Sequence, residues 1–147
     1  MRKPAKALRI FLDANVIFSA SYSPDGRSAA LFLLARKRLC RLVTSRLALE
    51  EAHRNLEQQR PEALKIFQRH LPWMIVVPEA DSSRLEKVRS MGLDSGDVPI
   101  LAAAINHCDL LVTGDIKHFG PWMGEVVQGL RVISLASAIE LLTQTTS

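Results

Sequence analysis

Four acidic residues stand where a folded chain could gather them into one site. Asp13 and Asp115 each follow a short apolar run, Glu51 lies inside a helical pattern, and Asp97 opens another. In a parallel α/β sheet, the carboxyl ends of the strands and the starts of the next helices share the edge where ligands bind. If the four carboxylates meet at that edge, they form a site for a divalent metal ion.

Such a cluster needs a counter-ion, because two unit charges about 4 Å apart repel by roughly 4 kcal/mol at an effective dielectric near 20. Mg²⁺ or Mn²⁺ removes this repulsion, and both ions prefer oxygen ligands. One or two such ions can polarise a phosphate oxygen, generate hydroxide from bound water and stabilise a leaving oxygen. Hydrolysis of a phosphodiester is the chemistry that these residues predict.

Each acid also has a structural explanation. Asp13, with Asn15 two residues later, fits a common turn sequence. Asp115 could simply end a strand, and Asp97 could cap the helix whose first turn contains Pro99. Their joint placement, and not any one of them, favours a metal site.

Glu50 and Glu51 compete for the same role, because neighbouring helix residues point about 100° apart and only one can enter the site. Glu50 has Arg46 four residues before it and Arg54 four residues after it, which is the spacing of solvent-facing ion pairs. The pattern therefore favours Glu51 for the site.

Short apolar runs alternate with longer amphipathic ones, which predicts an α/β fold with a mostly parallel sheet of about five strands. The expected strands are 8–12, 41–44, 74–77, 110–113 and 131–134, and the expected helices are 28–38, 46–58, 61–69, 82–91, 98–106 and 135–142. Ser45 suits a helix N-cap, Pro61 a first turn and Gly92 a helix end. We expect one domain over 8–142, between a basic tail 1–7 and a C-terminal tail 143–147.

Composition sets the class of protein. The 147 residues are 48% hydrophobic and 23% charged, which is ordinary for one soluble domain, and the net charge of +4 permits nucleic-acid binding. Cys40 and Cys108 lack the spacing of a zinc site, so we expect them to be reduced and buried. No stretch approaches the roughly 18 apolar residues of a membrane span or forms the apolar core of a signal peptide. These features predict a cytoplasmic protein.

Taken together, the motifs resemble the PIN domain family, which includes many metal-dependent ribonucleases and VapC-like toxin components of bacterial toxin-antitoxin pairs. The matching stretches, in order, are FLDANVIFSA (11–20), TSRLALEE (44–51), DSGDVPILAAA (94–104) and LLVTGD (110–115). The resemblance implies a three-layer α/β/α sandwich and a metal site formed by Asp13, Glu51, Asp97 and Asp115. It also implies an RNA substrate, a cognate antitoxin partner and a homodimer.

Supporting residues follow from the same resemblance. Asn15 matches the polar residue after the first acid and Thr113 the hydroxyl before the last, and both would orient ligands or water. Many members carry an extra acid just before the third one, where this chain has Gly96, with Asp94 slightly earlier. This departure bears on the strength of metal binding and not on its location.

Basic residues supply candidates for contacts with RNA. Arg36, Lys37 and Arg38 form the densest basic cluster, which is usually a solvated helix end but could hold RNA phosphates if it lay near the acid edge. Lys117 and His118 stand where many members carry another acid. His118 could protonate a leaving group or hold the RNA backbone, although an exposed turn residue is the commoner case.

The sequence thus predicts a Mg²⁺- or Mn²⁺-dependent endoribonuclease that cuts single-stranded or structured RNA and serves as the toxin of a toxin-antitoxin pair. A catalytically weak PIN-like module that binds RNA or protein is the first alternative. A haloacid-dehalogenase-like phosphatase is more distant, because that chemistry needs an acid two residues after the first one, where this chain has Asn15.

Overall fold

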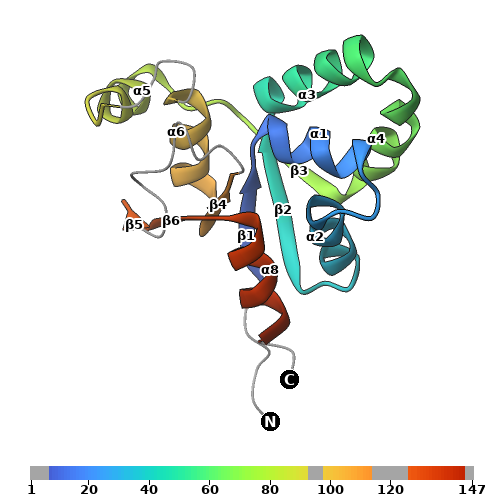
Figure 1. Cartoon of the computed structure of the whole chain (residues 1–147). Coiled ribbons are helices and arrows are strands. Elements are labelled where there is room, and N and C mark those ends of the chain that lie inside the picture. Colours follow the sequence, from blue (N-terminus) through green and yellow to red (C-terminus); the bar gives the residue numbers. More distant parts are fainter. Residues whose placement is uncertain (1–6, 93–97, 114–125, 145–147) are drawn as a thin grey trace.

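Five parallel strands and one short antiparallel strand form the sheet of this computed structural model, which describes residues 7–92, 98–113 and 126–144 (Figure 1). The strands are β1 (Leu8–Leu12), β2 (Cys40–Ser45), β3 (Met74–Val77), β4 (Leu110–Val112), β5 (Val126–Val127) and β6 (Leu130–Ile133). Their order across the sheet is β3-β2-β1-β4-β6-β5, and β5 alone is antiparallel to its neighbour in the described sheet. The predicted mostly parallel sheet is confirmed, and β5 is an addition to it.

Helices cover both faces of this sheet. They are α1 (Ala14–Tyr22), α2 (Arg27–Arg36), α3 (Arg46–Gln59), α4 (Leu64–His70), α5 (Ser82–Arg89), α6 (Val98–His107) and α8 (Leu135–Gln144), with short 3₁₀ turns η1 (Pro61–Ala63) and η2 (Leu71–Trp73). Figure 1 shows α5 and α6 on one side of the sheet and α1 to α4 on the other. The three-layer α/β/α arrangement is confirmed.

Alternate side chains of the central strands pack into two separate cores, one on each face of the sheet. Ile10 and Leu12 of β1 pack into the core under α1, α2, α3, α4 and α8, whereas Phe11 between them packs into the core under α5 and α6. In β2, Leu42 packs into the first of these cores and Val43 into the second. Because both faces are buried, the central strands are mostly apolar runs, interrupted by Arg9 in β1 and Arg41 in β2, and this is why the sequence located them within about two residues.

The helix α1 was not predicted. Its sequence contains Val16, Ile17 and Phe18, residue types of modest helix propensity, and it follows an Asp that also suits a turn. Two tertiary features decide the outcome: the Asp13 side chain caps the helix, and the buried face with Val16, Ile17 and Ala20 packs into the core. Burial of this face thus outweighs the modest helix propensity of the α1 sequence.

The predicted helix ends are mostly right. Ser45 caps α3, since its hydroxyl accepts a hydrogen bond from the Ala48 N–H at 3.2 Å. Pro61 begins a 3₁₀ turn and not the α-helix itself. The helix predicted over 82–91 ends at Arg89, and Gly92 follows in the left-handed conformation, with φ of +88°.

The strand order reverses beside β1. The chain runs outward from β1 through β2 to β3, and then β4 pairs with the other side of β1, with Leu12 opposite Val112. In open α/β sheets, ligands bind outside the carboxyl ends of the strands at such a reversal. The residues that follow Leu12 and Val112 therefore occupy the favoured position for a site.

Both cysteines are free, as expected. Cys40 is buried and Cys108 is half-buried. Burial raises the pKa of Cys40 to about 11 and that of Cys108 to about 12, so both thiols are protonated and unreactive near neutral pH. Within the described ranges, no helix combines the length and apolar character needed to cross a bilayer.

His70, the last residue of α4, is a buried titratable group. Its ring stacks on Phe32 with centroids 4.0 Å apart, and its Nε2 lies 3.3 Å from the Ala20 carbonyl oxygen. The other ring nitrogen, Nδ1, is buried and has no hydrogen-bond partner among the described residues. Burial lowers the pKa of His70, the bond to Ala20 opposes this shift, and the nearby Arg36 lowers the pKa further.

We predict that His70 makes the fold sensitive to acid. Because its pKa is lower in the folded state than the ordinary 6.5, the unfolded chain takes up the proton first. Stability is therefore full above about pH 6.5 and falls as the pH drops toward the folded pKa. Urea unfolding at about pH 8 and about pH 5.5 should show a larger loss for the wild type than for His70→Phe, which keeps the ring stack without titrating. His53→Gln, which removes an exposed histidine, is the control and should lose as much stability as the wild type. An equal loss of stability in the wild type and in His70→Phe would contradict the prediction.

Candidate metal centre

Asp13 follows β1 at the reversal of strand order, and this residue is only 5% exposed. Its Oδ1 accepts a hydrogen bond from the Val16 N–H at 2.9 Å, which caps α1. Its Oδ2 accepts a hydrogen bond from the Thr113 hydroxyl at 2.7 Å. The carboxylate is thus fixed between β1, the positive end of α1 and the end of β4.

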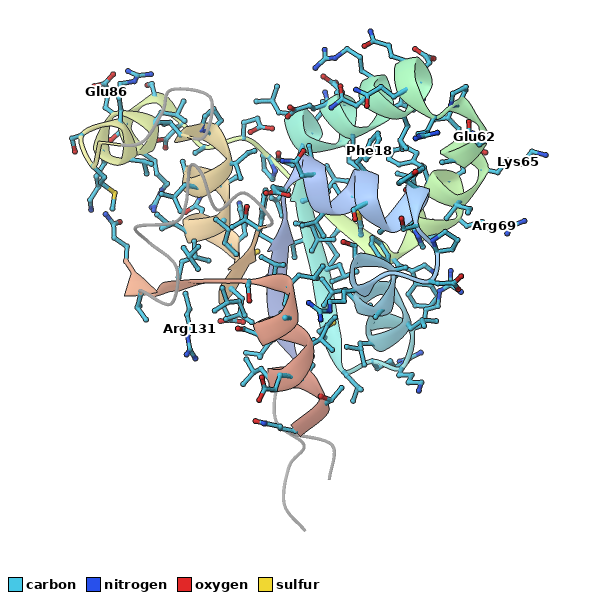
Figure 2. All side chains as sticks on the ribbon, in the orientation of Figure 1. Phe18, Glu62, Lys65, Arg69, Glu86 and Arg131 are labelled. Atoms are coloured by element: carbon cyan, nitrogen blue, oxygen red, sulfur yellow. The ribbon has the colours of Figure 1, made fainter. Side chains whose placement is uncertain are left out.

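This burial sets Asp13 apart from the other described acids. Every other described Asp or Glu is outside the buried class, whereas Asp13 belongs to it. Figure 2 shows the contrast in its labelled charged side chains, which project away from the protein: Glu62, Lys65, Arg69, Glu86 and Arg131. A buried carboxylate costs free energy unless hydrogen bonds or a cation compensate it.

Hydroxyl groups surround the same edge of the sheet. Thr44, at the end of β2, is buried and donates to the Leu12 carbonyl oxygen at 3.0 Å. Ser45 follows and caps α3, and Thr113 follows β4. The edge therefore gathers a carboxylate and three hydroxyls, an oxygen-rich set of groups that suits a hard ion such as Mg²⁺ or Mn²⁺.

Thr44 was not among the predicted site residues, although the sequence gives a signal that it lies at this edge. It ends a predicted strand that lies beside β1, just as Asp13 and Thr113 follow predicted strands. Arg46 was also missed as a cation at this edge. It is exposed at the start of α3, beside a cavity of about 410 Å³ that Val76, Pro78 and other residues line.

Glu51 and Asn15 lie on the two helices that start at this edge. Asn15 is exposed in the first turn of α1, and Glu51 is exposed in the second turn of α3. The two helices pack against each other. The structure thus brings the elements of Asp13, Asn15 and Glu51 together.

Glu50 is also exposed, so exposure does not separate it from Glu51. The ion pairs expected for Glu50 are not formed. Within the described residues, the salt bridge present joins Arg89 to Glu86 on α5, and neither Arg46 nor Arg54 pairs with Glu50.

The remaining candidates fall outside the described residues: Asp94, Asp97, Asp115, Lys117 and His118. Their neighbours in the chain are described. Asp97 directly precedes α6, and Asp115 comes two residues after Thr113. Among the residues that the structure describes, no three His, Cys, Asp or Glu side chains converge as a metal site.

The basic cluster Arg36, Lys37 and Arg38 lies at the wrong end of the sheet for the role considered above. It joins the end of α2 to the start of β2, and β2 begins opposite Leu8, at the amino end of β1 (Figure 1). A five-residue strand at about 3.3 Å per residue separates this end from Asp13. The condition set for its role in RNA binding, a place near the acid edge, is therefore not met.

Comparison with known proteins identifies the fold. A family model described as PIN domain matches residues 9–117. No curated protein sequence is significantly similar to the chain.

Two solved structures share its architecture. One is a chain in the crystal structure of VapBC2 from Rickettsia felis bound to a DNA fragment from their promoter, with a TM-score of 0.62 and 18% identity over 86% of this chain and 98% of that one. The other is PAE2754 from Pyrobaculum aerophilum, with a TM-score of 0.68 and 17% identity over 95% of this chain and 93% of that one. At such identities the likeness shows the fold alone.

The family model spans most of the chain and includes all but the first residue of β1, Asp13, Thr113 and the helices between them. The chain therefore belongs to the PIN domain family, whose members are in general nucleases that depend on divalent metal ions.

Proposed function

We propose that this protein is a cytoplasmic, Mg²⁺- or Mn²⁺-dependent endoribonuclease that hydrolyses phosphodiester bonds in single-stranded or structured RNA. The observation that carries the proposal is the buried Asp13 carboxylate at the reversal of strand order, held by Val16 and Thr113. Membership in a family of nucleases supports it.

Helix capping alone does not explain the burial of Asp13. Asp81 caps α5 through an equal bond, from its Oδ1 to the Arg84 N–H at 2.9 Å, and it does so while exposed. Ser45 caps α3 while buried, without carrying a charge. Since a serine would cap α1 about as well as an aspartate, the buried charge at position 13 needs another reason. Binding of a cation provides that reason.

Asp13 would hold the metal, and we propose that Glu51, Asp97 and Asp115 complete the ligand set, with one or two ions bound. When bound, Mg²⁺ or Mn²⁺ would supply polarisation of a phosphate oxygen and a more acidic water. The protein's own contribution is orientation. The Thr113 hydroxyl and the Val16 N–H bind the two oxygens of Asp13, so that the carboxylate would face the ion in one rotamer.

Other residues keep supporting roles in this proposal. Asn15 is exposed in the first turn of α1, where an amide can orient water or RNA, and Asp94 would assist the ligands. Lys117 and His118 would contact the RNA backbone. The phosphatase alternative is weaker, because Asn15 cannot supply the acid that this chemistry needs and the family match favours a nuclease.

We further propose that the protein is the toxin of a toxin-antitoxin pair, acts as a homodimer and is inhibited by a cognate antitoxin. Similarity in fold to a chain of VapBC2, a toxin-antitoxin complex, supports the antitoxin partner, and the homodimer is proposed by analogy with PIN-domain toxins alone.

The first test is cleavage of labelled single-stranded RNA by the wild type and Asp13→Asn, with Mn²⁺ or Mg²⁺ and with EDTA. We expect metal-dependent cutting by the wild type and a loss of about 100-fold or more in the variant, because a ligand of the metal is removed. Asparagine caps helices as well as aspartate does, so circular dichroism should show an unchanged fold.

Asp81→Asn is the matched control, because it makes the same chemical change at another helix cap. It should cut RNA at the wild-type rate. If the folded wild type neither cuts RNA nor binds Mn²⁺ in calorimetry, the protein is instead a binding module that has kept the acids without the chemistry.

Thr113→Val tests the support of Asp13. The variant keeps the shape of the side chain but removes its donor, which should cost about 1.5–3 kcal/mol of stability in urea unfolding. We also expect Mn²⁺ affinity, measured by calorimetry, to fall about 10–100-fold, and Thr113→Ser to restore it. A loss of stability with unchanged Mn²⁺ affinity would show that Thr113 is structural only.

Expression in bacteria tests the proposed toxin role. The wild type alone should arrest growth, whereas Asp13→Asn at an equal protein level should not. Co-expression of the product of the adjacent gene should relieve the arrest. Harmless expression of an active nuclease would refute the toxin role and leave the nuclease proposal intact.

A further inference from the structure

A second cavity lies at the amino ends of β2 and β3, opposite the acid edge. Its volume is about 330 Å³. Its apolar lining includes Pro72, Trp73 and Ile75, and its basic lining consists of Arg38 and Arg41. The size is at the lower end of the range for ligand pockets, which is enough to seat one side chain of a partner.

Positive charge gathers in and near this cavity. Arg36, Lys37, Arg38 and Arg41 are exposed, and among the described residues none of them forms a salt bridge. Arg36 lies over the ring of Trp73, with its guanidinium carbon 5.6 Å from the ring centroid. A cluster of like charges is most stable beside an anionic partner.

Arg38 occupies an unfavourable position for its residue type. Its φ is +62°, and the Leu39 N–H that follows bonds back to the Leu34 carbonyl oxygen at 3.0 Å. Glycine is the favoured residue at such a helix end. Arg38 therefore lies beside the cavity in a left-handed backbone conformation that costs free energy for any residue other than glycine.

The strand β3 offers backbone groups beside the cavity. It is the last strand in the order of the described sheet, so one side pairs with β2 and the other has no strand partner among the described residues. Trp73, Ile75 and Val76 are 40%, 42% and 49% exposed, and no charged residue interrupts Trp73–Val77. An exposed apolar edge of this kind is a template for an added strand.

We propose that this face binds an extended acidic segment of a partner protein. The segment adds a strand to the free side of β3, places an apolar side chain in the cavity and directs carboxylates to Arg38 and Arg41. Strand addition supplies affinity through main-chain hydrogen bonds, and an arginine binds a carboxylate through two parallel bonds. The inference is independent of the nuclease activity, because the face lies at the other end of the sheet.

Other possible occupants of this face match fewer of its features than an acidic strand does. Residues 1–6 carry Arg2, Lys3 and Lys6 and no acid, so their charge has the wrong sign. A second copy of the chain brings the same basic cluster and a net charge of +4. RNA phosphates match the charge, but they leave the free strand edge and the aliphatic lining unused.

The test uses a fluorescein-labelled decapeptide of alternating glutamate and valine, with fluorescence anisotropy as the readout on the full chain. We expect saturable binding that falls at least about tenfold in Arg38→Glu/Arg41→Glu. Arg27→Glu, at the other end of α2, makes the same kind of charge change and should leave the affinity unchanged. A peptide with lysine in place of glutamate should not bind.

A second pair of probes separates strand addition from charge attraction. The same peptide, N-methylated at alternate residues along one edge, keeps its charge but cannot pair with β3, and its affinity should fall at least about tenfold. If the charge-reversed variant misfolds by circular dichroism, Arg38→Asn/Arg41→Gln replaces it, because asparagine tolerates the positive φ at position 38.

Three results would overturn the proposal. The first is no binding of the acidic peptide, or binding that neither the variant nor N-methylation weakens. The second is a labelled single-stranded RNA that binds through Arg38 and Arg41 when the peptide does not, which would assign the face to nucleic acid. The third is a dimer, seen in sedimentation, that the double variant abolishes, which would assign it to a second copy of the chain.

Discussion

The structure depends on the burial of one charged group at the point where the strand order reverses. Asp13 links β1 and α1, which are consecutive in the chain, to the remote end of β4: it follows β1, caps α1 and accepts a hydrogen bond from the Thr113 hydroxyl after β4. Its negative charge is stabilised by the positive end of the helix and by two hydrogen bonds. The fold thus presents a carboxylate in a fixed orientation, which is what a metal site requires of its ligands.

The rest of the molecule makes that arrangement rigid. The central strands send alternate side chains into two cores, so β1 and β4 are held from both faces. Thr44 donates to the Leu12 carbonyl oxygen, which ties the end of β2 to the residue just before Asp13. Packing at native density leaves little room for the edge to shift, and the oxygen groups therefore stay in register.

The two ends of the sheet have opposite chemical character. The carboxyl end gathers Asp13 with the hydroxyls of Thr44, Ser45 and Thr113, whereas the amino end carries arginines around an apolar cavity. About one strand length separates them, which exceeds the Debye length of about 8 Å at physiological ionic strength. The ends can thus bind different partners with little electrostatic interference.

Sequence by itself determined the fold class, the parallel strands and the place of Asp13 after the first strand, because all three depend on local hydrophobic patterns that burial on two faces makes unambiguous. It did not predict α1, whose helix forms through tertiary burial, and it left the place of the Arg36 cluster open, because the distance of that cluster from the acids depends on strand direction. The choice of Glu51 over Glu50 as the site residue rested on helical periodicity, and the exposure of both residues in the structure does not separate them. Only the tertiary structure decided that Thr113 bonds to Asp13, since the order of strands in the sheet, and not any local pattern, brings residues 100 positions apart into contact.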